Sequence, residues 1–168
     1  DCLLQYGAKK VYAIDVGFGI LHWKLRNDPR VVVMERTNAR NVKLFPDEID
    51  FVTIDASFIS LKVLLPVVKT WLHKDSKIIM LIKPQFEAGR KDAAKGAGVI
   101  RNANIHRKIL FDTLEFASNN GFHFEDLMTS PLIGPKGNIE FLAYLSIGEV
   151  DSGGQIEEAI NSIIPDVE

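Results

Sequence analysis

Three ionisable residues stand where apolar, strand-like runs begin or end, and they are the first candidates for chemistry. Asp55 follows the run FVTI, Lys83 follows IIMLI, and Glu140 precedes FLAYL. Ligands of open α/β sheets bind beyond the carboxyl ends of the parallel strands, so Asp55 and Lys83 should reach one crevice. If the last strand is antiparallel, it begins at the same edge of the sheet, and Glu140 joins them.

A lysine near two carboxylates at such an edge is suited to proton transfer. A lysine that is shielded from water loses its proton more readily, and it can then act as a base. Asp55 and Glu140 would orient it, and several ionisable groups in one crevice are typical of an active site. Each residue also has an ordinary explanation when taken alone, because strands commonly end in charged residues.

Two further strand ends carry residues that suit a nucleoside. Asp15 follows VYAI, and its carboxylate can accept hydrogen bonds from two ribose hydroxyls or cap a helix formed by GILHW. Asn38, in ERTNAR, offers a donor and an acceptor to an adenine edge, although turn chemistry would also explain it. A nucleoside-containing cofactor would bind at these strand ends. The residues expected to line its site are Asp15, Val16, Asn38, Ala39 and Asp55.

The elements that must position these residues follow from hydrophobic periodicity. Short apolar runs predict strands, and apolar residues at three-and-four spacing predict helices. Ser60 is the expected N-cap of one helix, and Gly121 is the expected end of another. The expected strands cover residues 11–16, 31–36, 51–56, 77–83, 122–132 and 139–147, and the expected helices cover residues 19–26, 61–72 and 102–121.

Strands that alternate with helices predict an α/β fold with a mostly parallel sheet. Only the turn GPKGN separates the last two strands, so these two should pair in an antiparallel manner. A parallel doubly wound sheet that ends in an antiparallel strand is the architecture of Rossmann-like methyltransferases.

The opening segment DCLLQYGAKK has the pattern of the last turns of a helix that ends at Gly7. In a doubly wound sheet, a strand and a glycine turn should precede that helix. We therefore expect the first strand to be missing from this chain, as it would be in a piece of a longer protein. Residues 1–150 would form a partial domain with this Rossmann-like methyltransferase architecture, and residues 151–168 would form a linker and a short C-terminal helix.

The composition argues against several other classes of protein. The single cysteine, Cys2, cannot form an internal disulfide, and no apolar run reaches the ~18 residues of a membrane helix. The four histidines lack the spacing of metal ligands, so no metal site is expected. We expect a cytoplasmic protein that does not bind membranes.

Charge is distributed unevenly along the chain. The net charge is −2, which does not indicate general attraction to nucleic acid. Residues 90–108 nevertheless hold six basic residues and one acid. This stretch is either a solvated loop or a contact for a phosphate backbone.

The segments YAIDVG, ERTNAR, IDASFISL, IKPQFEAGR and SPLIGPKGNIEF together resemble the hemolysin A (TlyA) family. The members of this family are FtsJ-like ribose 2'-O-methyltransferases that act on ribosomal RNA. The resemblance extends to about Leu145, and IDASFISL and IKPQFEAGR are its most specific parts. Family members carry an RNA-binding domain, a lysine and a glycine-rich turn ahead of these segments, and none of the three is in this chain.

The resemblance implies a catalytic set of two lysines, an aspartate and a glutamate. Asp55, Lys83 and Glu140 match three of them, and the first lysine has no counterpart here. The cofactor would be S-adenosylmethionine, with Asp15 on its ribose and Asn38 near its adenine. The partner would be ribosomal RNA or a ribosomal subunit, and the fragment by itself should be inactive because half of its site is absent.

Three other functions account for part of the sequence. A pore-forming hemolysin fits an alternating α/β pattern poorly. A Rossmann dehydrogenase fits the fold class and Asp15, but it does not call for Asp55, Lys83 and Glu140 together. An RNA-binding protein with an inactive methyltransferase fold stays open.

Overall fold

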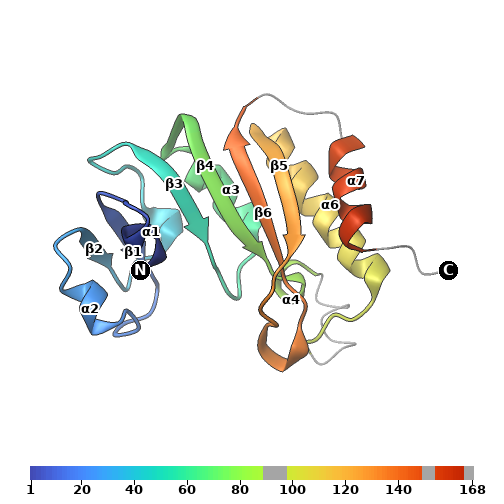
Figure 1. Cartoon of the computed structure of the whole chain (residues 1–168), viewed down its shortest axis with the longest axis horizontal. Helices are drawn as coiled ribbons and strands as arrows, with labels where there is room; N and C mark the ends of the chain where they lie inside the picture. The colour runs from blue at the N-terminus through green and yellow to red at the C-terminus, as the bar shows by residue number, and fades with distance from the viewer. Residues whose placement is uncertain (89–97, 149–153, 165–168) are drawn as a thin grey trace. The chain divides into compact units, whose positions relative to one another are not determined.

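The computed structural model describes residues 1–88, 98–148 and 154–164, which belong to two compact units. The first unit comprises Asp1–Leu44, and the second begins at Phe45. Each unit has its own sheet, with β1 and β2 in the first and β3, β4, β6 and β5 in the second (Figure 1).

The first unit is built on a parallel pair of short strands. β1 (Val11–Ile14) pairs residue for residue with β2 (Val31–Met34). Both strands lie within the predicted ranges, and each ends two residues earlier than the prediction, at Ile14 and Met34. The remaining elements of this unit are α1 (Cys2–Gln5), α2 (Trp23–Arg26) and the 3-10 helix η1 (Ala39–Asn41).

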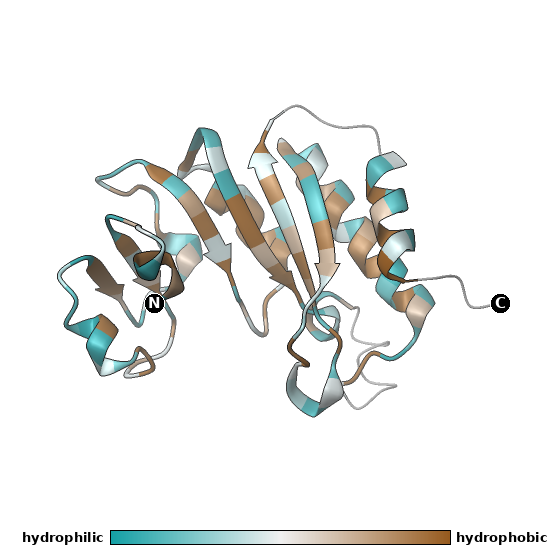
Figure 2. Ribbon diagram, viewed as in Figure 1, coloured by the Kyte–Doolittle hydropathy of each residue, from teal (hydrophilic) through white to brown (hydrophobic). Residues whose placement is uncertain are grey.

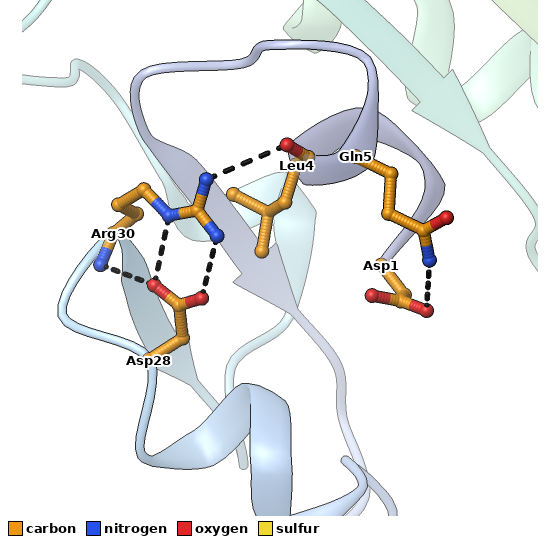
Figure 3. Close-up of polar contacts among 5 residues, drawn as sticks. All are labelled: Asp1, Leu4, Gln5, Asp28 and Arg30. Atoms are coloured by element: carbon orange, nitrogen blue, oxygen red, sulfur yellow. Dashed lines mark hydrogen bonds and ion pairs between the residues drawn. The ribbon is translucent and has the colours of Figure 1, made fainter.

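A charged contact joins α1 to the turn that precedes β2 (Figure 3). Arg30 binds both carboxylate oxygens of Asp28, with Nε 3.1 Å from Oδ1 and Nη2 2.8 Å from Oδ2. Its Nη1 also donates to the carbonyl oxygen of Leu4 at 3.4 Å. The hydrogen bond from Arg30 lowers the pKa of Asp28 to about 2, so the pair stays ionised throughout the neutral range.

Glu35, directly after β2, holds the loop that follows β1. Its carboxylate accepts hydrogen bonds from the Arg26 guanidinium at 2.6 Å and from the backbone N–H of Gly19 at 3.0 Å. These contacts, the bond from Arg26 above all, lower the pKa of Glu35 to about 2. The loop that contains Asp15 and Val16 is thereby fastened to the end of the neighbouring strand.

The second unit contains a mixed sheet in the order β3–β4–β6–β5. β3 (Ile49–Ile54) runs parallel to β4 (Leu72–Ile82), whereas β6 (Phe141–Ile147) is antiparallel to both β4 and β5 (Phe122–Thr129). The α/β class and the antiparallel last strand are confirmed. β4 begins earlier than predicted, at Leu72 instead of Lys77, because Leu72 already pairs with Ile49 at the start of β3.

Alternation along the strands buries one face of this sheet. In β4, Ile78, Met80 and Ile82 have no exposed surface, whereas Ile79 and Leu81 are half-buried. Figure 2 shows the hydrophobic colouring concentrated along this central part of the sheet. Each such side chain contributes about 1.5–3 kcal/mol when it is fully removed from water.

α3 (Leu61–Lys69) begins after the predicted N-cap, Ser60, whose Oγ accepts a hydrogen bond from the backbone N–H of Lys62 at 3.2 Å. Pro66 lies within the helix, but its position is exposed, so water can bind the carbonyl that loses its partner. The buried residues follow the helical spacing and are Leu61, Leu64, Leu65 and Val68.

α6 (Ala103–Asn119) and α7 (Gly154–Ile163) lie side by side, and α6 also packs against α3 and β5 (Figure 1). α6 ends before Gly121, whose φ of +80° suits the predicted glycine terminator. Among the residues that the structure describes, no helix combines the length and the apolar character that crossing a bilayer requires.

Candidate active site

Lys83 is the first residue after β4, and its ammonium group reaches the loop that follows β3. Nζ lies 2.5 Å from Oδ1 of Asp55 and 3.2 Å from Oγ of Ser57. β3 and β4 are parallel neighbours, so their carboxyl ends share one edge of the sheet. The structure therefore brings two of the three predicted catalytic residues into direct contact.

Glu140 immediately precedes β6 at the same edge. The register pairs Ile82 with Phe141, so Lys83 and Glu140 are the next residues along two antiparallel strands. Glu140 is 5% exposed, and its Oε1 accepts a hydrogen bond from Nε2 of Gln85 at 2.8 Å. The carboxylate is thus linked to the Lys83 segment through Gln85.

The backbone of Gly134 packs against the Glu140 carboxylate. A Cβ atom at this position would lie 2.5 Å from Oε1 and 2.7 Å from Cδ of Glu140. The φ of Gly134 is −68°, an ordinary value, so close approach rather than backbone conformation requires the glycine. The Gly134 N–H donates to the Asn138 carbonyl at 2.9 Å, which closes the loop before β6.

α4 (Pro84–Glu87) follows Lys83 and brings a second carboxylate back to α3. Oε2 of Glu87 accepts a hydrogen bond from the Ser60 hydroxyl at 2.6 Å, and Oε1 accepts one from the backbone N–H of Leu61 at 2.7 Å. A carboxylate at the start of a helix satisfies a free N–H and is favoured by the helix dipole.

Two phenylalanines lie beside these charged groups. Phe58 is 90% exposed and has a φ of +63°, a left-handed conformation that is uncommon for residues other than glycine. Its ring centroid is 4.9 Å from that of Phe86, and Nζ of Lys83 lies 6.0 Å from the Phe86 centroid. An exposed ring held in a strained conformation offers a stacking surface next to the site.

The other predicted cofactor residues lie in the first unit, whereas Asp55 lies in the second. Oδ1 of Asp15 accepts a hydrogen bond from the Gly17 N–H at 2.7 Å, and Val16 is 70% exposed. The alternative that Asp15 caps the next helix is wrong, because His22 is the N-cap of α2.

Asn38 and Ala39 form the start of η1. Oδ1 of Asn38 accepts a hydrogen bond from the backbone N–H of Arg40 at 3.1 Å, which is the turn role considered for it. Ala39 is the first residue of η1 and is half-buried. The amide nitrogen of Asn38 still supplies the donor that an adenine edge would need.

The predicted basic stretch is only partly described. Arg90, Lys91 and Lys95 lie outside the described residues. Arg107 donates to the side chain of Asn161 and to the carbonyl of Ile164, and so it joins α6 to α7. Its charge has a structural use, which weakens the case for a phosphate contact at that position.

Sequence reasoning missed four residues that shape the site, namely Ser57, Gln85, Glu87 and Gly134. All four lie in segments that also carry predicted site residues. Gln85 and Glu87 follow Lys83 at alternate positions, and this spacing was the available signal. Their partners depend on the single turn of α4, which is too short to be recognised from periodicity.

Comparison with known proteins places these observations in a family. The family model described as FtsJ-like methyltransferase matches residues 1–147. The 16S/23S rRNA (cytidine-2'-O)-methyltransferase TlyA of Mycobacterium tuberculosis is 42% identical over 147 residues, which are 86% of this chain and 54% of that protein. The chain spans 54% to 62% of the lengths of three curated relatives that it matches.

Two solved structures share the fold. A Streptococcus thermophilus protein assigned as a hemolysin has a TM-score of 0.88 and 42% identity, with 96% of this chain and 60% of that chain covered. A Listeria monocytogenes protein assigned as an S-adenosylmethionine-dependent methyltransferase has a TM-score of 0.63 and 15% identity, covering 87% and 83% of the two chains. The second likeness concerns the fold alone. Because the family match extends over most of the sequence, the chain belongs to the FtsJ-like methyltransferase family.

Proposed function

We propose that the protein carrying this chain transfers a methyl group from S-adenosylmethionine to a ribose 2'-hydroxyl of ribosomal RNA, with Asp55, Lys83 and Glu140 as its catalytic residues. The observation that carries the proposal is the contact between Lys83 and Asp55 at the edge of the sheet where Glu140 also lies. Family membership and the name of the mycobacterial relative support the reaction class and the substrate.

The ribose hydroxyl is a weak nucleophile, so the site must orient it and remove its proton. As an ammonium group, Lys83 donates a hydrogen bond that aligns the hydroxyl oxygen. When its amine is neutral, Lys83 accepts the hydroxyl proton as the oxygen attacks the methyl group. The buried carboxylate of Glu140 is a second acceptor that fixes the direction of the hydroxyl. In-line alignment is the main demand of a methyl transfer.

The residues of the first unit fit S-adenosylmethionine by their chemistry. The Asp15 carboxylate can accept from ribose hydroxyls, exposed Val16 offers apolar surface, and Asn38 has a free amide donor for adenine, next to Ala39. Asp55, in the second unit, is the fifth residue predicted to contact the cofactor, and its side chain is 73% exposed. When bound, the cofactor supplies a methyl group activated by a sulfonium.

The proposal extends to domain organisation and location. Residues 1–150 form the methyltransferase domain, and residues 151–168 form a linker with a terminal helix; the family match to residue 147 supports the first boundary. The reaction takes place in the cytoplasm, where ribosomal RNA is present.

The test uses the protein at its natural length, radiolabelled S-adenosylmethionine and ribosomal RNA. Lys83→Ala should abolish transfer and leave cofactor affinity nearly unchanged. Lys77→Ala is the matched control, because Lys77 lies in β4, the strand that precedes Lys83, and pairs with Glu125 at 3.0 Å. Undiminished methylation by Lys83→Ala would refute the assigned role, and no methylation by the parent protein would refute the function.

A further inference from the structure

α4 is a single turn, yet it follows Lys83 and makes contact with the two other segments that carry predicted catalytic residues. The side chains of residues 83, 85 and 87 each reach a different partner. Lys83 binds Asp55 and Ser57, Gln85 binds Glu140, and Glu87 binds the start of α3.

The loop between β3 and α3 is held at both ends by this one segment. At its beginning, Lys83 contacts Asp55 and Ser57. At its end, Glu87 accepts hydrogen bonds from the Ser60 hydroxyl and the Leu61 N–H. A shift of this loop relative to Lys83 would therefore break either the contact between Lys83 and Asp55 or the hydrogen bonds to the Glu87 carboxylate.

Gln85 holds Glu140, the third predicted catalytic residue, through a hydrogen bond. Nε2 must face the Glu140 carboxylate, since the reversed amide would bring two acceptor oxygens together. Gly134 packs against the same carboxylate, so Glu140 is confined between Gln85 and the backbone of the loop before β6.

The turn itself is stiff for its length. Pro84 occupies its first position with a fixed φ, and Lys83 before it has the extended conformation that proline imposes. The N–H groups of Phe86 and Glu87 both donate to the Lys83 carbonyl, at 2.9 and 3.2 Å. The backbone that bears Lys83 is thus bonded to the turn that bears Glu87.

We propose that α4 sets the mutual geometry of Asp55, Lys83 and Glu140, and that Gln85 and Glu87 are positioning residues. Neither contacts the reacting atoms: Gln85 acts through Glu140, and Glu87 acts through the loop that carries Asp55. The inference rests on the methyltransferase function proposed above.

Substitution of Glu87 tests the first contact in the natural-length protein. Glu87→Met removes both acceptor oxygens at similar size, whereas Glu87→Gln keeps an acceptor for the Leu61 N–H. We expect Glu87→Met to lower the single-turnover rate of methyl transfer by about tenfold to hundredfold, as small misplacements do, with unchanged cofactor affinity and stoichiometry. Glu87→Gln should stay within about threefold of the parent rate.

Gln85→Met removes the donor to Glu140 and should lower the same rate by about tenfold. Glu125→Gln is the matched control, because this carboxylate lies on β5 and pairs with Lys77 away from α4. The control should keep the parent rate. Rates are expressed per protein molecule that binds cofactor. A smaller folded fraction in a variant therefore does not lower its measured rate.

Amide hydrogen exchange supplies a readout that does not depend on activity. In Glu87→Met the Leu61 N–H should exchange at least about tenfold faster than in the parent, while Val68 in the same helix keeps its protection. Should Glu87→Met fail to fold, the rate of Gln85→Met still decides the outcome: a parent-like rate would overturn the inference.

The inference would be overturned by parent-like rates in Glu87→Met and Gln85→Met. It would also be overturned if Glu87→Gln were as slow as Glu87→Met. Neither result would contradict the methyltransferase function. If the parent protein transferred no methyl group to ribosomal RNA, the function would fail. The exchange rate of the Leu61 N–H would then be the remaining test of Glu87. An equal rate in Glu87→Met and in the parent protein would count against the positioning role of Glu87.

Discussion

Lys83 and Asp55 form an ion pair whose two members differ sharply in their exposure to solvent. Nζ and Oδ1 lie 2.5 Å apart, while the side chain of Lys83 is 12% exposed and that of Asp55 is 73% exposed. Water and salt screen an exposed carboxylate, so such a pair adds little to the free energy of folding. We infer that the pair matters more for chemistry than for stability.

Asp55→Asn should therefore separate the two effects. We expect the rate of methyl transfer to fall by about a hundredfold, since Lys83 loses its charged partner, while the free energy of unfolding changes by less than about 1 kcal/mol. Methylation assays and urea denaturation measure the two quantities. Asp50→Asn is the control, because Asp50 lies on β3, the strand that precedes Asp55, is 89% exposed and pairs with His73.

Gly134→Ala should disturb Glu140 through a single methyl group. The added Cβ would lie 2.5 Å from Oε1, so either the carboxylate or the loop must move. We expect a loss of about 1–3 kcal/mol in the free energy of unfolding, together with slower methyl transfer. Gly154→Ala, where a Cβ would meet no described atom within 4 Å, should change neither. Parental stability and rate in Gly134→Ala would contradict the close packing.

Phe58→Asn tests whether the exposed ring binds RNA. Asparagine tolerates the left-handed backbone, so stability should change by less than about 0.5 kcal/mol. Loss of a stacking surface should raise the KM for RNA by about tenfold, within the range measured for single base contacts, and leave cofactor affinity unchanged. Phe58→Tyr keeps the ring and should restore the parental KM. An unaltered KM in Phe58→Asn would exclude the stacking role.

His106 makes stability depend on pH. It is buried, its Nε2 lies 2.9 Å from the Ile100 carbonyl oxygen, and burial lowers its pKa. In the unfolded chain the imidazole takes up a proton near pH 6.5, whereas the folded protein keeps it neutral to lower pH. The free energy of unfolding should therefore fall as pH drops below about 6.5, by at most about 1.4 kcal/mol per pH unit.

Chemical denaturation at several pH values between 7.5 and 5 measures this dependence. His106→Gln should have a flatter profile than the parent, because glutamine does not titrate and can still donate to a carbonyl. Asp28 and Glu35 have folded pKa values of about 2. In the unfolded chain they take up protons at about pH 4, so most of their contribution to the pH dependence falls below this window. An equally steep profile in His106→Gln would assign the effect to another group.

The placement of Asp55 and Lys83 at one edge of the sheet was predictable from the sequence, and the contacts between the side chains at that edge were predictable only in part. Asp55 and Lys83 each follow a run of buried apolar residues, and parallel neighbours must present both ends at one edge. Periodicity cannot specify side-chain rotamers, so the hydrogen bond between Gln85 and Glu140 could not be foreseen. The capping role of Glu87 also depends on a turn that local propensity does not predict.

Turn residues gave mixed results for a physical reason. Ser60 was correctly predicted as an N-cap because its hydroxyl needs only the N–H groups that follow it in sequence. Asp15 was considered for the same role, but its carboxylate binds the nearer Gly17 N–H, and His22 caps α2 instead. Several acceptors compete for few donors in such loops, and the sequence does not rank them.

β6 follows β5 in the sequence but lies between β4 and β5 in the sheet. During synthesis both flanking strands are therefore made before the strand that joins them, and their facing edges stay unpaired in the meantime. Glu140 directly precedes β6, so the nascent protein acquires its third candidate catalytic group at the moment when the sheet can close. A chain arrested before residue 140 would lack β6, so the facing edges of β4 and β5 would stay unpaired and prone to aggregation. It would also lack Glu140, the third candidate catalytic residue.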